Sequence, residues 1–567
     1  MKKKWWHEKI GYQIYPKSFL DTNGDGVGDL AGVIEKLPYL EQLGVDILWL
    51  SPVYPSPMVD NGYDISDYEN IDPRFGTLED MDRLIAEAKK KNISIIMDLV
   101  VNHCSDQHAW FRKAIADPKG PYGDYFYLKE GKDGKEPNNW RSYFGGSVWE
   151  KLPGQENLYY YHAYAKEQPD LNWENPALRE EIYKMVNWWL DRGIAGFRID
   201  AIINIKKDLT WEDLPVDGPD GRGFLTNSIT RMQKRDGGTK NGIGVFLREL
   251  KERCFAPHDA FTVGEVFEVD REQLEEFIGE DGYFSTMFAF DPIQSYKKGT
   301  CQCEFDRNMN PDEWKRDVFV NQKLLGDIAF EANIIENHDM ARGATIYIPD
   351  EDYGFASISA LAGLQVLQRG MPFLYQGQEI GMTNCPFELE DIDDIMTLDN
   401  YRYAVACGFP EEKAFAGCAR ESRDNARTPM QWSDAENAGF TTGKPWLKVN
   451  PNYPEINVAR QEKEYGSVLN FYRRLLCFRK SEEYRDLLTY GTFEPMYEDQ
   501  ERIFAFKRTL GKQCLTVICN ESPAERFLTL KEDYEEVVFV NLPQVTRIGD
   551  NLILHPYQLI VVETTKK

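Results

Sequence analysis

Short apolar runs alternate with amphipathic segments over about the first 480 residues of the chain. Eight of these apolar runs are predicted to be strands: Gly11–Tyr15, Asp46–Leu50, Ser94–Val101, Gly196–Ile199, Ala260–Val263, Ser285–Phe290, Asn333–Ile335 and Pro372–Tyr375. Strands that alternate with helices favour a parallel sheet covered by helices. The pattern therefore predicts an α/β protein with a (β/α)8 TIM barrel, whose active site would lie at the C-terminal ends of the strands.

Capping residues mark two of the intervening helices. Thr77 precedes the amphipathic segment LEDMDRLIAEAKKK, and Asp80 follows three positions later, which is a capping-box pattern. Asn175 and Pro176 predict the start of a second helix, and Gly193 predicts its end.

Three segments depart from this alternation. Residues 104–173 are rich in Trp, Tyr, Gly and Pro without a helical period, which predicts an irregular lobe over the barrel mouth after strand 3. Residues 383–440 form another long excursion, after the eighth strand. From about residue 487, short β-rich runs divided by polar turns predict a C-terminal antiparallel β-sandwich. We therefore expect a barrel from 1–103 and 174–480, an inserted lobe at 104–173 and a sandwich at 481–567.

The composition narrows the possible partners. The 567 residues include 66 basic and 93 acidic side chains, a formal charge of −27, which repels nucleic acids and anionic membranes. The sequence shows no apolar run of about 18 residues and no signal peptide, so we expect a cytoplasmic protein. The ten cysteines are scattered, and Cys301 and Cys303 are too close together to form a zinc set, so reduced thiols are expected. A small neutral substrate and a monomer or weak homo-oligomer fit this picture.

Polar side chains gather at the predicted C-terminal ends of four strands: Asp98, Asn102, His103, Arg198, Asp200, Glu265, His338 and Asp339. Each residue alone is more often a buried, satisfied polar group than a functional one. Together they bring several carboxylates to one barrel mouth, where catalysis occurs in this fold. The sequence offers no Gly-rich phosphate loop and no Cys/His cluster, so no organic cofactor is expected. Paired carboxylates without a cofactor indicate glycoside hydrolysis.

The motifs DLVVNH, GFRID, GEV and NHD occur in this order and resemble the signature regions of glycoside hydrolase family 13, the α-amylase superfamily. DTNGDGVGDL, VDNGYDISDY, QPDLNWENP and ESRDNARTPMQW resemble its oligo-1,6-glucosidase and α-glucosidase subfamily. The resemblance extends from about residue 5 to about residue 480, and the C-terminal sandwich fits it too.

The resemblance implies roles for particular residues. Asp200 corresponds to the nucleophile, Glu265 to the general acid/base and Asp339 to the transition-state stabiliser. The residues expected to hold the innermost glucose are His103, Arg198 and His338, and those expected around its non-reducing end are Asp60, Tyr63, Gln168, Arg423 and Arg427. Asp60 and Arg427 would form a charged end wall that enforces exo-action. The carboxyl groups of Asp200 and Glu265 should lie about 5–5.5 Å apart, the separation found in retaining enzymes.

The loop DTNGDGVGD presents oxygens at alternate positions: the side chains of Asp21, Asn23, Asp25 and Asp29, and the carbonyl of Val27. Gly32 stands where an EF-hand would have its bidentate Glu, so the loop is not an EF-hand. The resemblance implies a structural Ca²⁺ or Mg²⁺ here, and an Asp/Gly-rich turn without metal is the alternative.

Ala201 follows the nucleophile. In the subfamily, valine at this position accompanies α-1,6 preference and smaller residues accompany α-1,4 activity. We therefore expect a retaining, exo-acting α-glucosidase for short α-1,4- or α-1,6-linked glucosides, with sucrose as a further candidate. The alternatives are a sucrose isomerase or other glucosyltransferase, a trehalose-6-phosphate hydrolase, and a non-catalytic membrane-anchored relative. The full acid set and the lack of a membrane span weigh against the last of these.

Overall fold

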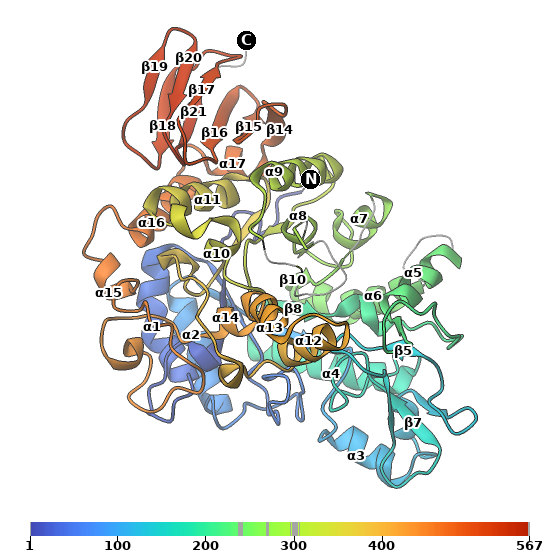
Figure 1. Cartoon of the computed structure of the whole chain (residues 1–567). Coiled ribbons are helices and arrows are strands. Elements are labelled where there is room, and N and C mark those ends of the chain that lie inside the picture. The colour runs from blue at the N-terminus through green and yellow to red at the C-terminus, as the bar shows by residue number, and fades with distance from the viewer. Residues whose placement is uncertain are drawn as a thin grey trace.

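The computed structural model describes residues 2–235, 242–267, 271–294, 296–297, 304 and 307–564. Its centre is an eight-stranded parallel sheet in the order β11-β10-β8-β3-β2-β1-β13-β12 (Figure 1). A parallel bridge between Phe288 and Ala332 joins the two outer strands and closes the barrel. Its strands are β1 (Gly11–Ile14), β2 (Ile47–Leu50), β3 (Ser94–Val100), β8 (Gly196–Asp200), β10 (Phe261–Gly264), β11 (Thr286–Met287), β12 (Ala332–Asn333) and β13 (Met371–Tyr375). The eight-stranded barrel predicted from the sequence is confirmed.

Helices surround the barrel and its mouth. The longer ones are α1 (Leu30–Leu43), α2 (Leu78–Lys90), α4 (Pro176–Arg192), α5 (Thr226–Arg235), α6 (Ile243–Leu250), α7 (Arg271–Ile278), α9 (Pro311–Leu325), α11 (Phe355–Leu367) and α16 (Val468–Lys480). Shorter ones are α8 (Asp291–Gln294), α10 (Gly343–Tyr347), α14 (Asp424–Arg427), α15 (Val458–Gln461) and α17 (Arg485–Tyr490). The predicted capping box at Thr77 and Asp80 is present, and α4 has Asn175 as its N-cap and Gly193 in a left-handed conformation at its end.

The lobe that follows β3 has its own small sheet, formed by β4 (Leu128–Glu130), β7 (Leu158–Tyr161) and β6 (Trp149–Lys151). The lobe shows no helical period in the sequence, yet it contains the short helix α3 (Ala109–Ala116), whose first turn is capped by His108. Only Phe111 and Ala114 of this helix are fully buried, so its apolar period was too short to detect. A parallel pair of β5 (Trp140–Arg141) and β9 (Gly223–Phe224) ties the lobe to the segment that follows β8.

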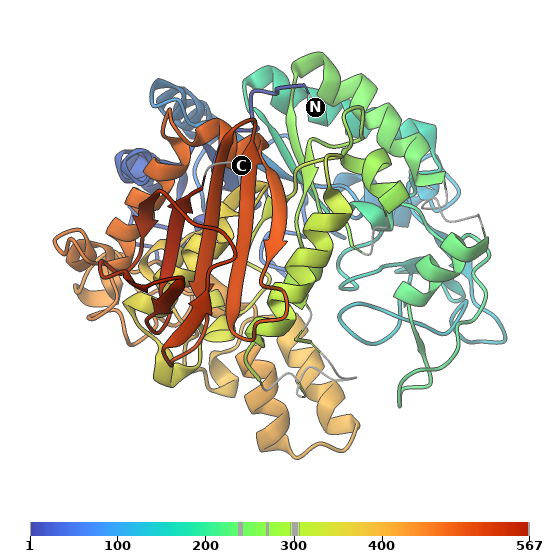
Figure 2. The same ribbon diagram turned by 90° about the horizontal axis from the view of Figure 1, so that it is seen from above.

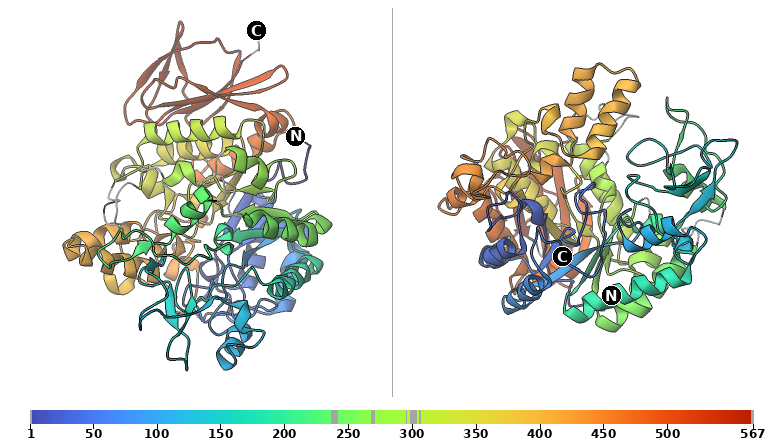
Figure 3. Two further views of the ribbon diagram at one scale, coloured as in Figure 1. Left: turned by 90° about the vertical axis from the view of Figure 1, so that its right-hand side faces the viewer. Right: turned by 90° about the horizontal axis from the view of Figure 1, so that it is seen from below.

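The excursion after β13 contains α12 (Ile395–Ala406) and α13 (Glu411–Arg420), which pack against each other. The lobe follows β3 and this pair follows β13, so both rise from the C-terminal ends of barrel strands. Figures 2 and 3 show the lobe and the helix pair projecting from the body as separate protrusions.

The C-terminal strands form two antiparallel sheets. The larger contains β14 (Thr492–Met496), β15 (Ile503–Leu510), β16 (Gln513–Asn520), β21 (Leu559–Glu563) and β18 (Glu536–Val540), and the smaller contains β17 (Arg526–Thr529), β20 (Asn551–Leu554) and β19 (Thr546–Ile548). Trp314 of α9 and Phe504 of β15 pack edge to face, with ring centroids 5.3 Å apart, so the larger sheet rests on the barrel helices.

The sequence analysis also led to expectations about membrane spans and cysteines. No helix in this part of the chain is long and apolar enough to cross a membrane. Eight of the ten cysteines lie within the described residues, and each of these eight is a free thiol, while Cys301 and Cys303 lie outside.

Candidate active site

The proposed nucleophile and acid/base stand on neighbouring strands. Ile199 of β8 aligns with Gly264 of β10, and Asp200 and Glu265 each follow one residue later. Gly196 opens β8 so close to β10 that a Cβ atom there would collide with the carbonyl oxygen of Phe261, so the position needs glycine. Neighbouring strands run about 4.8 Å apart, which places the two carboxyl side chains side by side at the barrel mouth.

A single guanidinium joins these carboxyl groups. One nitrogen of Arg198 lies 2.6 Å from Asp200 and 2.8 Å from Asp98, and the other lies 3.1 Å from Glu265. Arg198 and Asp98 are fully enclosed, whereas the side chains of Asp200 and Glu265 keep 11% and 15% of their surface exposed. The enclosed pair therefore supports two carboxyl groups that face an open space, as a nucleophile and an acid/base must.

Protonation of this cluster is shared. Burial raises the pKa of Asp200 while Arg198 opposes that rise, and burial raises the pKa of Asp98 to about 6. Asp98 and Asp200 share the Arg198 guanidinium and repel each other, so the protonation of one depends on that of the other. Catalysis by retention requires an ionised Asp200 and a protonated Glu265 when the substrate binds.

A pH profile tests this coupling. Activity should fall as the pH is lowered, because burial raises the pKa of Asp200 and its protonation removes the nucleophile. The Asp98 carboxylate raises the pKa of Asp200, so in Asp98→Asn the acid limb of kcat/KM should move to lower pH. Initial rates across about pH 4 to 8 measure the shift, with thermal melting as the folding control. An unmoved acid limb in a folded variant would disprove the coupling.

The third carboxyl group, Asp339, is surrounded by cationic and donor groups. Its oxygens lie 3.0 Å from Arg427, 3.3 Å from Arg423 and 2.9 Å from Nε2 of His338. Burial acts to raise the pKa of Asp339, but His338, Arg423 and Arg427 hold it well below its usual range. Asp339 therefore stays ionised and can stabilise positive charge that develops on a sugar ring.

His338 is a neutral hydrogen-bond relay. Burial lowers its pKa to about 4. The side-chain amide nitrogen of Gln13 lies 2.7 Å from Nδ1 and donates to it, so Nε2 carries the ring proton. This N–H points at Asp339, and the Tyr63 hydroxyl lies 2.5 Å from the same Nε2. Tyr63 donates to Asp98 at 2.9 Å, and its ring stacks on His338 with centroids 5.3 Å apart. The relay fixes the orientation of Asp339 relative to Asp98.

One end of the site is closed by an ion pair. Arg423 lies 3.0 Å from Asp60 and 2.6 Å from Asp394. Gln168 donates to Asp60 at 3.1 Å and contacts His103 at the same distance. The expected wall partner, Arg427, is fully buried against Asp339 instead, so Arg423 takes its place beside Asp60. Nothing local in the sequence indicated Asp394, because it contacts the wall only through tertiary packing.

The cavity between these groups has a volume of about 480 Å³. Seven of the twelve candidate residues line it: Asp60, Tyr63, His103, Asp200, Glu265, Asp339 and Arg423. Gln168, Arg198, His338 and Arg427 lie behind this lining and hold it through the contacts above. Eleven further residues complete the wall: Tyr143, Phe144, Tyr164, Ile203, Asn204, Phe224, Thr226, Ile229, Phe267, Asp291 and Met396.

Ala201 has an unusual backbone conformation. Its φ of 43° lies in the left-handed region, and its N–H donates to Glu265 at 2.7 Å. Such a φ is costly for β-branched residues, and it aims this N–H at the acid/base. The position therefore affects the catalytic pair through its backbone as well as through side-chain volume.

The candidate metal loop lies between β1 and α1. Asp21 accepts hydrogen bonds from the N–H groups of Asn23, Gly24 and Gly26, and Asp29 caps α1 through Gly32. Among the described residues, no three His, Cys, Asp or Glu side chains converge as a metal site would require. The possible ligands in this loop are all oxygen atoms, which suit a hard cation. Such a cation would need the oxygens of Asn23 and Val27 in addition to the carboxylates. The ion stays a prediction.

Chelation tests the loop. If Ca²⁺ binds there, EDTA should lower Tm by roughly 3–8 °C, because the ion stabilises the folded chain by mass action. Asp25 is exposed and bonds only locally, to the N–H of Val27, so Asp25→Ala should abolish the EDTA response. Differential scanning calorimetry with and without added Ca²⁺ gives the comparison. Equal Tm values for the untreated and chelated protein would disprove a bound ion.

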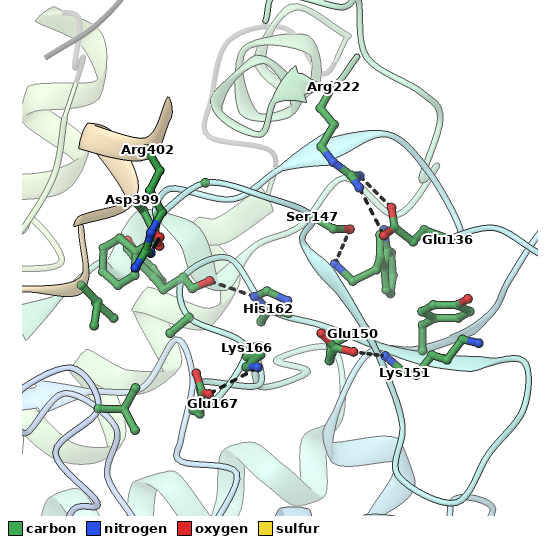
Figure 4. A pocket seen from close by; sticks show the side chains of 18 of the residues that line it. Glu136, Ser147, Glu150, Lys151, His162, Lys166, Glu167, Arg222, Asp399 and Arg402 are labelled. Carbon is green, nitrogen blue, oxygen red and sulfur yellow. Dashed lines mark hydrogen bonds and ion pairs between the residues drawn. The ribbon is translucent and has the colours of Figure 1, made fainter. Parts of the chain in front are cut away.

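A larger hollow of about 930 Å³ lies between the lobe and α12 (Figure 4). Some of its charged side chains form ion pairs, as Arg222 does with Glu136 at 2.7 Å and Arg402 with Asp399 at 2.6 Å. Phe144 and Tyr164 line both this hollow and the catalytic cavity. Asp200, Glu265 and Asp339 are not among the described residues that line it, so the smaller cavity is the candidate site of reaction.

Comparisons with known proteins agree with this geometry. Residues 13–491 match the model of the α-amylase catalytic domain. The chain is 42% identical over 553 residues to an oligo-1,6-glucosidase of Halalkalibacterium halodurans, which covers 94% of this chain and 96% of that protein. It is 40% identical over 567 residues to a glucan 1,6-alpha-glucosidase of Streptococcus pneumoniae, with 99% and 100% covered.

A solved structure has the same fold over its whole length. The trehalulose synthase of Pseudomonas mesoacidophila MX-45 superposes with a TM-score of 0.90 at 38% identity, and both chains are fully covered. The barrel, the carboxyl cluster at its mouth and these full-length similarities lead to one conclusion. The chain belongs to the α-amylase family and is a glycoside hydrolase of the oligo-1,6-glucosidase type.

Proposed function

We propose that the chain is a retaining, exo-acting α-glucosidase that removes α-glucose from the non-reducing end of short α-glucosides. The observation that carries the proposal is the position of Arg198, which touches both Asp200 and Glu265 beside a cavity closed at one end by Asp60 and Arg423. The closed end has room for a terminal sugar, and a chain extended past it would collide with the ion pair.

The proposed mechanism has two steps. Glu265 gives its proton to the leaving oxygen while Asp200 attacks the anomeric carbon, so the glycosidic bond breaks and a β-glucosyl ester forms. Glu265, now a base, then takes a proton from water, and the water oxygen displaces Asp200 to release α-glucose. Asp339, which His338 holds in place, binds the sugar more tightly as positive charge develops on the ring.

The resemblance leaves the linkage open between α-1,4 and α-1,6 glucosides, with sucrose as a third substrate. A sucrose isomerase would share the covalent intermediate, and its fructose acceptor would intercept that intermediate before water does. A trehalose-6-phosphate hydrolase needs cations near the leaving sugar. Among the described lining residues the permanent cation is Arg423, and it is committed to Asp60 and Asp394 at the closed end.

One experiment separates these functions. Initial rates on maltose, isomaltose, sucrose and trehalose-6-phosphate should show release of α-glucose from the unphosphorylated substrates, with the product anomer followed by NMR before mutarotation. Freshly released β-glucose would overturn the retaining mechanism. Isomaltulose or trehalulose as the main product from sucrose would overturn hydrolysis as the proposed reaction. Activity confined to trehalose-6-phosphate would establish a trehalose-6-phosphate hydrolase.

A further inference from the structure

The hollow between the lobe and α12 (Figure 4) lies behind the closed end of the catalytic cavity. Here called the lobe hollow, it is bounded by Val59, Arg222, lobe residues between 134 and 167, and α12 residues between 395 and 402. Three of its residues adjoin, along the chain, a residue of the closed end: Val59 adjoins Asp60, Glu167 adjoins Gln168 and Ile395 adjoins Asp394. The two spaces therefore lie back to back.

Aromatic side chains separate the two spaces. Phe144 and Tyr164 line both, and their rings pack edge to face with centroids 5.5 Å apart. Arg423, which lines the catalytic cavity, places its guanidinium 5.2 Å from the Phe144 ring. None of the described residues that line the lobe hollow is a catalytic carboxyl group. A ligand in the lobe hollow would therefore occupy a separate site, outside the path of the reacting substrate.

The charges that line the lobe hollow nearly cancel. Among the described residues, five of its side chains are basic and four are acidic. Arg222 binds Glu136 through two hydrogen bonds of 2.7 and 3.2 Å, and Arg402 lies 2.6 Å from Asp399. Each of these four side chains keeps at least 23% of its surface exposed, so its remaining hydrogen-bonding positions are open to a ligand. A polyion gains little from this balance, and an apolar ligand would strip water from charged groups at a cost.

His162 presents a hydrogen-bond acceptor in a fixed direction. Its side chain lines the lobe hollow and the residue is 5% exposed. Nδ1 lies 2.8 Å from the carbonyl oxygen of Tyr164 and donates to it, so Nε2 is the nitrogen without a proton. Burial lowers the pKa of His162, which keeps the ring neutral. No described residue forms a hydrogen bond with Nε2, so this nitrogen is available to a hydroxyl group of a ligand.

Apolar surface lies next to these polar groups. Val59, Ile395 and Leu398 line the lobe hollow and are half-buried, so each leaves part of its side chain open. A ligand that fits this wall combines apolar C–H surface with hydroxyl groups that donate and accept, and sugar chains have this combination. The lobe hollow has a volume of about 930 Å³ against about 480 Å³ for the catalytic cavity, which gives room for more than one sugar ring.

We propose that the lobe hollow is a second, non-catalytic site that binds a neutral oligosaccharide. Nε2 of His162 and the carboxylate of Asp399 accept from its hydroxyl groups, while Arg222 and Arg402 donate to them. The inference goes beyond the proposed function, because that function needs only the catalytic cavity and its carboxyl groups. A sugar chain bound here is held beside the catalytic cavity, which raises the local concentration of substrate.

Calorimetry on an inactive enzyme tests the second site. Isomaltotriose titrated into Asp200→Asn should show two binding events per chain. The basic glucose analogue 1-deoxynojirimycin, at a concentration that saturates the catalytic cavity, should remove one event and leave the other. Loss of all isomaltotriose binding in the presence of the analogue would overturn the inference and leave the proposed function intact. Glucose release by Asp200→Asn would contradict the proposed nucleophile, and the event that persists with the analogue would still decide the inference.

Two further substitutions, each combined with Asp200→Asn, locate the persistent event. His162→Phe keeps a flat ring and removes the acceptor, so the Kd of this event should rise by about threefold to tenfold. Asp399→Asn should raise it by a similar factor, and this exposed-pair variant serves if the buried His162 variant melts early. Glu412→Gln is the matched control, because Glu412 is exposed on the neighbouring α13 and does not line the lobe hollow. An unchanged Kd in both folded test variants would overturn the inference.

Discussion

Asp200→Asn should lower kcat by at least about a thousandfold, because an amide cannot form the glucosyl ester. Asn has the same shape as Asp and can still accept from Arg198 through its oxygen, so the fold and the closed end of the cavity should persist. Glucose release from isomaltose and maltose measures the loss, and thermal melting checks the fold. Asp67→Asn makes the same exchange at an exposed position and should keep the activity.

A trapped intermediate makes this prediction specific. A fluorinated glucosyl donor that slows the second step should label the unmodified enzyme, and peptide mass spectrometry should place the adduct on Asp200. The variant should show no adduct. A folded variant that keeps more than about a tenth of kcat, or an adduct on another carboxyl group, would disprove the assignment of the nucleophile.

The barrel and its acidic mouth could be predicted because both are local patterns. Each strand is a short apolar run, and Asp200 and Glu265 end two such runs within motifs that carry a strong resemblance. Parallel strands bring their C-terminal ends together, so the convergence of these carboxyl groups follows from the fold alone. Helix boundaries with caps, as at Thr77, could be predicted for the same local reason.

The remaining parts of the site depend on contacts between distant segments. Asp60 and Arg423 are 363 positions apart, and their pairing is decided by how the excursion after β13 folds back over the mouth. Local propensity carries no information about such a pair, and the expectation that Arg427 would lie there came from the resemblance alone. Phe224 and Ile229 come from a segment whose apolar residues have no clear periodicity. The pairing of β5 with β9 positions Phe224 at the cavity.

Glu265→Gln should lower kcat/KM on isomaltose by roughly a hundredfold to ten thousandfold, because the leaving alkoxide loses its proton donor. The loss should be much smaller on 2,4-dinitrophenyl α-glucoside, whose phenolate leaves without protonation. With that substrate the first step stays fast while the second lacks its base, so a burst of phenolate should precede slow turnover. Stopped-flow absorbance measures the burst, and equal losses on both substrates would indicate a structural role for Glu265.

Azide then distinguishes the two carboxyl groups by product. It needs no general base, so it should restore turnover of the activated substrate by Glu265→Gln and give α-glucosyl azide, because it displaces Asp200 from the face opposite the ester. In Asp200→Ala no ester forms, and azide that enters the vacated space should attack from the opposite face and give β-glucosyl azide. NMR of the two products identifies the anomers. The same anomer from both variants would contradict the proposed mechanism, in which Asp200 and Glu265 act on opposite faces of the sugar.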